Sequence, residues 1–119
     1  MFESLKQLIA TKGVIGAYIA NTTGHIVAQE GKLSHLPLLK MTAEIRDLLI
    51  NEKVKQQDDP ARVHYEFDNM VITIQKLKVG FLVIVSEPLS ANALLRLSIN
   101  VVCSQLNNNP KLLKSIATA

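Results

Sequence analysis

The sequence has little cysteine and few aromatic side chains. Its single cysteine, Cys103, rules out a disulfide bond within the chain, and such a chain is typical of the cytoplasm. Tryptophan is absent, and two Tyr and three Phe leave little surface on which bases could stack. The net charge of +3 comes from Lys and Arg scattered along the chain, mostly beside an acidic residue. We therefore expect no nucleic-acid partner.

Long hydrophobic runs are also missing. The longest unbroken apolar run, Val79–Val85, contains a glycine and is far shorter than the roughly 20 residues of a membrane span. Near the start, Glu3 and Lys6 interrupt the apolar residues, so the pattern of a signal peptide is not seen. The sequence therefore predicts a cytoplasmic protein without a membrane span.

The motifs of common catalytic and cofactor sites are missing as well. Six residues separate Gly24 from Gly31, where a phosphate-binding loop has four, and Leu33 follows Lys32 where such a loop has Ser or Thr. The three histidines have no likely partner ligand at metal-binding spacing. Cys103 lies in an apolar stretch without a cation one turn away, which predicts a buried, unreactive thiol. We expect no enzyme, no cofactor and no metal.

What is present is an apolar chain of 119 residues, of which 48% are hydrophobic and 19% charged. This length suits one domain with a single core, and the composition argues against disorder. We place the domain at residues 1–107. The polar segment Asn107–Pro110 ends the last long apolar stretch, so we expect residues 108–119 to form a flexible C-terminal tail.

The apolar pattern changes between helical and strand periods along the chain. Helical spacing occurs at residues 2–9, 38–49 and 91–106, and strand patterns occur at residues 14–20, 25–29, 62–67, 70–77 and 81–87. The order α-β-β-α-β-β-β-α predicts an α+β fold. We expect a five-stranded antiparallel sheet, with the first and last helices on one face and the middle helix on the other.

A short polar segment, Asn21–Gly24, separates the first two strands. An asparagine suits the start of a turn, and Gly24 can take the left-handed conformation that closes a bulged hairpin. We therefore interpret the segment as a corner. The alternative is an enzyme of unrecognised type, with a site built from Thr22, Thr23 and His25.

Two surfaces are suited to contact with another chain. The strand Val63–Phe67 follows a long polar loop and is a natural sheet edge, which must be paired or covered. The middle helix has a broad apolar face. A two-fold contact through both surfaces is the simplest way to cover them.

With this order of elements, the sequence resembles the Roadblock/dynein light chain family. The resemblance extends from Phe2 to about Leu106. It is carried by Leu8–Ile9, Gly13–Ile19, Gly24–Ala28, the spaced leucines of the middle helix, Met70–Gln75 and Gly80–Val85 with the helix that follows. One departure is in the first turn, where the family often has an aspartate before the glycine and this chain has Asn21, Thr22 and Thr23.

The resemblance implies a non-catalytic protein that forms homodimers or heterodimers and that scaffolds or regulates a Ras-like small GTPase, or serves as a dynein light chain. By position, the dimer contact falls on Leu38, Met41, Ile45 and Leu49 of the middle helix and on Val63, His64, Tyr65, Glu66 and Phe67 of the third strand. The candidate GTPase contacts are Glu44, Arg46, Asp47, Lys111 and Lys114.

A rival interpretation is a small-molecule sensor, because a sheet flanked by helices can open a ligand cavity. Against it, the sequence gives no obvious set of polar side chains that converge on the central strands.

Overall fold

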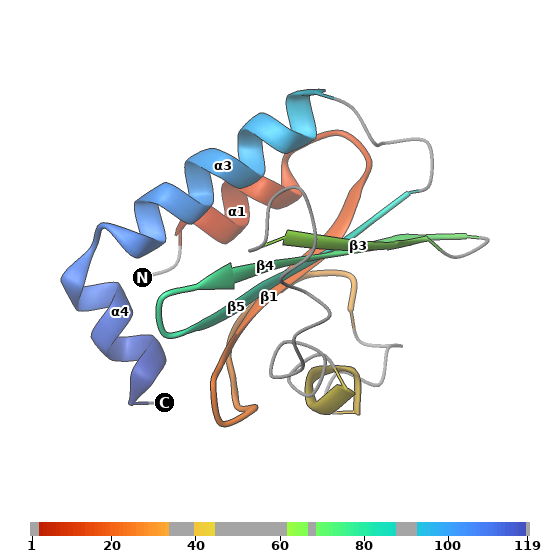
Figure 1. Ribbon diagram of the computed structural model, residues 1–119. Helices are drawn as coiled ribbons and strands as arrows, with labels where there is room; N and C mark the ends of the chain where they lie inside the picture. Colours follow the sequence, from red (N-terminus) through yellow and green to blue (C-terminus); the bar gives the residue numbers. More distant parts are fainter. Residues whose placement is uncertain (1–2, 34–39, 45–61, 67–68, 88–92, 119) are drawn as a thin grey trace.

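The computed structural model describes residues 3–33, 40–44, 62–66, 69–87 and 93–118. This part of the chain contains a five-stranded antiparallel sheet in the order β2-β1-β5-β4-β3 (Figure 1). The strands are β1 (Val14–Asn21), β2 (Ile26–Gly31), β3 (Arg62–Glu66), β4 (Val71–Leu77) and β5 (Gly80–Ser86). The helices are α1 (Glu3–Ile9), α3 (Ala93–Asn107) and α4 (Pro110–Ala117). The predicted α+β class and antiparallel sheet are confirmed.

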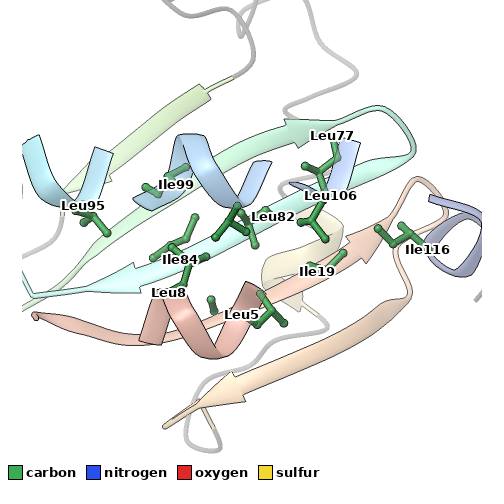
Figure 2. Close-up of a cluster of buried hydrophobic side chains, with 12 residues drawn as sticks. Leu5, Leu8, Ile19, Leu77, Leu82, Ile84, Leu95, Ile99, Leu106 and Ile116 are labelled. Carbon is green, nitrogen blue, oxygen red and sulfur yellow. The ribbon is translucent and has the colours of Figure 1, made fainter. Parts of the chain in front are cut away.

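Helices α1, α3 and α4 cover the first face of the sheet. Leu8 of α1 and Ile99 of α3 belong to one apolar cluster with Ile19, Leu82 and Ile84, which point to this face from β1 and β5 (Figure 2). Successive strand residues point to opposite faces, so the residues between these contribute to a second core. The prediction that the first and last long helices share one face is confirmed.

The second face carries its own apolar cluster, which includes Tyr18, Leu33, Ile74 and Phe81. Residues 40–44 are helical and lie on this side, opposite α1 and α3 (yellow in Figure 1). Because β1 and β5 are buried on both faces, their sequences are apolar almost without interruption. Within the described ranges, no helix has the length and apolar character of a membrane span.

The C-terminal segment differs from the flexible tail that we expected at residues 108–119. Asn109 caps a helix there, because its side-chain oxygen accepts hydrogen bonds from the backbone nitrogens of Lys111 (3.1 Å) and Leu112 (3.2 Å). Ile116 is fully buried against the first-face core, beside Ile19 in Figure 2. An asparagine cap followed by proline is a helix start as well as a helix stop, and the packed structure continues to the end of α4.

Candidate functional site

Strand β3 forms one edge of the sheet, since β4 is its only neighbour in the described part of the chain. The register pairs His64 with Thr73 and Tyr65 with Ile72. The outer side of an edge strand presents backbone N–H and C=O groups that a second chain can pair. The prediction that this strand lies at an edge of the sheet is therefore confirmed for the described residues. Strand β2 forms the opposite edge.

The side chains of β3 divide between the two faces. His64 and Glu66 are exposed on the α3 side, whereas Tyr65 is half-buried and packs against the second-face cluster. The His64 ring nitrogen Nδ1 lies 2.9 Å from the Thr73 hydroxyl oxygen, which ties the imidazole to β4. A partner that pairs with β3 would therefore meet a polar, charged surface on one face and an aromatic residue on the other.

The helical residues 40–44 are attached to the second face through a buried polar contact. Thr42 is fully buried, and its hydroxyl donates a hydrogen bond to the phenol oxygen of Tyr18 (3.0 Å). Burial raises the pKa of the Tyr18 phenol, and the hydrogen bond from Thr42 lowers it to a smaller extent. Met41 beside this anchor is half-buried and Glu44 is exposed. The helix thus presents Glu44 to solvent while Thr42 fixes its position.

Several predicted site residues lie outside the described residues or have no described side chain. They are Leu38, Ile45, Arg46, Asp47, Leu49 and Phe67, together with the side chain of Val63. Of the predicted dimer contacts, Met41, His64, Tyr65 and Glu66 can be placed. Met41 and Tyr65 lie on the second-face side of the sheet, whereas His64 and Glu66 point to the α3 side.

The structure does not bring the described GTPase-contact candidates together. Lys111 and Lys114 are exposed on α4, which packs on the first face. Glu44 is exposed on the segment that covers the second face, so the sheet separates it from both lysines.

The polar segment after β1 is held as a turn by one side chain. The Asn21 side-chain oxygen accepts hydrogen bonds from the Thr23 nitrogen (3.1 Å), the Thr23 hydroxyl (2.6 Å) and the His25 nitrogen (3.0 Å). Gly24 takes a φ of 92°, the left-handed conformation predicted for it. The interpretation of Asn21–Gly24 as a corner is confirmed.

The same contacts determine what Thr23 and His25 can do chemically. Nδ1 of His25 lies 3.2 Å from the Thr23 hydroxyl oxygen. The Thr23 hydroxyl also donates to the Asn21 side-chain oxygen, so the same proton is not at the same time available to the imidazole. Among the described residues, no group of three His, Cys, Asp or Glu side chains is placed to hold a metal ion. The arrangement closes a turn and does not activate a nucleophile.

This sheet order, with helices on both faces, is the fold of the Roadblock/LC7 domains. The chain is similar to the structure of Myxococcus xanthus MglB, with a TM-score of 0.79 and 12% identity over 95% of this chain and 94% of that one. A Roadblock/LC7 domain from Streptomyces avermitilis has a TM-score of 0.73 and 12% identity, with 89% and 93% covered. The gliding protein MglB from Thermus thermophilus has a TM-score of 0.72 and 14% identity, with 98% and 88% covered.

No model of a protein family and no curated protein sequence matches the chain significantly. At 12 to 14% identity the structural likeness establishes the fold. The resemblance found in the sequence motifs is confirmed at that level.

Proposed function

We propose that the protein is a non-catalytic, homodimeric interaction module that binds, scaffolds or regulates a Ras-like small GTPase. The observation that carries the proposal is a Roadblock/LC7 fold in which β3 is the last strand at one side of the described sheet. One structure of similar fold is described as MglB with a tetrameric arrangement (TM-score 0.73, 13% identity), which supports self-association of such domains. The lone cysteine leads us to expect the protein in the cytoplasm, and we propose that it binds the GTPase there.

In the proposed dimer, two β3 strands pair about a two-fold axis and join the two sheets into one. The strand Val63–Phe67 supplies this contact, and the middle helices lie side by side through Leu38, Met41, Ile45 and Leu49. Strand pairing satisfies the outward-facing backbone groups of an edge strand, and helix contact buries apolar surface. A paralogue with the same edge is the alternative partner.

The proposed GTPase contact uses the polar side of the middle helix, where Glu44, Arg46 and Asp47 follow one another closely. Glu44 is exposed, as such a contact requires. Lys111 and Lys114 of α4 are on the other face of the sheet, so we assign them to a second, separate contact with the same GTPase. Charged contacts of this kind mainly steer association and set specificity.

The test is direct binding to each Ras-like GTPase of the same cell, loaded with GDP or with a non-hydrolysable GTP analogue. We expect at least one GTPase to bind in one nucleotide state, and Glu44→Lys to weaken that binding about tenfold. Gln29→Lys is the matched control, because Gln29 is an exposed residue on the β2 edge. The proposal would be overturned if none of these GTPases bound and none changed its hydrolysis rate.

A further inference from the structure

A cavity of about 170 Å³ lies between the start of α3 and the β3 side of the sheet. Part of its lining is a row across three strands, in which Glu66 of β3 pairs with Val71 of β4 and Val71 pairs with Ser86 of β5. Leu95 and Arg96 line it from α3. The cavity is thus built by four elements that are far apart in sequence.

The buried end of this row is Ser86, whose hydroxyl forms no hydrogen bond with the other described residues. Ser86 is 1% exposed, and its hydroxyl has no hydrogen-bond partner among the described residues. Leu82 and Ile84, which precede it on the same face of β5, are apolar core residues. A buried hydroxyl without a hydrogen bond costs free energy. A ligand in the cavity that hydrogen-bonds to Ser86 would remove this cost.

Two opposite charges line the same cavity without neutralising each other. Glu66 projects from the edge strand and Arg96 from the helix, and neither forms an ion pair within the described structure. An Arg guanidinium is suited to bind a carboxylate through two parallel hydrogen bonds, and a Glu carboxylate is suited to accept from an ammonium group. A ligand that carries both groups would satisfy both side chains.

The rest of the lining limits what can enter. His64 and Thr73 form the next row across the strands, and the His64 Nδ1 and the Thr73 hydroxyl oxygen lie 2.9 Å apart. Because these two groups are held by each other, they limit the cavity on this side. Ile99 and Val71 add apolar surface. A volume of about 170 Å³ is below the roughly 300 Å³ of sites that hold drug-sized ligands, which favours a ligand smaller than a nucleotide.

We infer that this cavity binds a small free amino acid, with its carboxylate on Arg96, its ammonium group on Glu66 and a hydrogen bond to Ser86. At about 30 Å³ for each water molecule in the liquid, the cavity has room for about six waters. Alanine and serine have bonded heavy atoms, which pack more closely than separate waters, so both fit within this space. A ligand so small binds with a Kd of about 10 µM to 10 mM. The bound amino acid links β3 to α3, and its binding is measured on the purified protein without any GTPase.

The experiment is a titration of the ¹⁵N-labelled protein with alanine, glycine and serine, followed by amide chemical shifts. We expect saturable shifts at Ser86 and Arg96 for at least one of the three. N-acetylalanine lacks the ammonium group and alaninamide lacks the carboxylate, so each should bind at least about tenfold more weakly. The inference is wrong if no amino acid gives saturable shifts up to about 50 mM, beyond the expected range of Kd, or if either analogue binds as well as alanine.

Matched substitutions locate the binding. Arg96→Gln and Glu66→Gln each remove one charge from the cavity and should weaken alanine binding about ten- to a hundredfold. Lys111→Gln and Glu30→Gln remove the same charges elsewhere and should leave the Kd unchanged. Ser86→Val fills the cavity with a residue suited to a strand, and it should abolish binding while the protein stays folded. Equal Kd values for the cavity variants and the controls would contradict the assignment.

Discussion

Asn21 organises the first hairpin through a single side-chain oxygen. It is 1% exposed, and the three hydrogen bonds that this oxygen accepts define the path of the chain into β2. Removing the acceptor leaves the donors of Thr23 and His25 without this partner, at a cost of about 1 to 3 kcal/mol in the free energy of unfolding.

The first prediction compares Asn21→Ala with Asn21→Asp in chemical denaturation. The alanine variant should lose about 2 kcal/mol of stability. The aspartate variant keeps an acceptor oxygen in the same place and should lose clearly less. If Asn21→Ala unfolded at the same denaturant concentration as the parent protein, the role given to this side chain would be wrong.

Tyr18 gives the second prediction, which concerns alkaline pH. Burial raises the pKa of its phenol in the folded protein above the ordinary value of about 10. As pH rises, the unfolded chain therefore loses this proton first. The contribution of the Tyr18 phenol to the free energy of unfolding is fully present below about pH 10. It is lost as pH rises through the pKa of the phenol in the folded protein.

Tyr18→Phe removes this contribution together with the hydrogen bond from Thr42. At pH 7 we expect a loss of about 1 kcal/mol. Above pH 10 the stability of the parent protein should fall more steeply with pH than that of the variant, because only the parent has the buried Tyr18 phenol with its raised pKa. Parallel curves of unfolding free energy against pH would show that the Tyr18 phenol does not have the raised pKa.

Among the elements, α4 departs most from what the sequence suggested. Its eight residues are too few to be stable as an isolated helix, so its order depends on the buried Ile116 and the Asn109 cap. In the sequence, the Asn-Pro pair indicates the end of one helix, and the residues after it suit a short amphipathic turn that we expect to fray. Whether a short amphipathic segment packs or frays depends on an apolar site on the core, which the sequence does not reveal.

The third prediction concerns this helix. Ile116→Ala should destabilise the protein by about 2 to 4 kcal/mol, because it removes a fully buried side chain beside Ile19. Lys114→Ala, on the exposed side of the same helix, is the control and should change stability by less than about 0.5 kcal/mol. Similar values for both variants, measured by thermal unfolding, would mean that α4 is a loosely attached tail.

The strands could be predicted more fully than the cavity. The two-sided apolar pattern of β5 indicated a central strand, and the alternation of β3 after a long polar loop indicated an edge. The cavity was missed because its polar groups come from different elements. Only the register that aligns Glu66 with Val71 and Val71 with Ser86 places them together, and Ser86 alone is one polar residue at the end of an apolar strand.

At the scale of the whole molecule, the sheet has two edges in the described chain, β2 and β3, and the proposed function requires pairing through β3. His64 is the central residue of β3, so in a dimer whose strands pair about the middle of β3 its two copies come close to the two-fold axis. His64→Glu adds a negative charge beside Glu66 on each strand, and like charges across a strand pair repel. Gln29→Glu makes the same kind of change on the β2 edge.

Sedimentation velocity at micromolar concentration tests this central claim most directly. For a chain of 13.1 kDa, the account predicts a species of twice that mass for the parent protein and for Gln29→Glu, and a shift towards the single-chain mass for His64→Glu. A parent protein that sediments as a single chain would contradict the homodimer. A His64→Glu variant that stays dimeric while Gln29→Glu dissociates would contradict the choice of β3 as the shared edge.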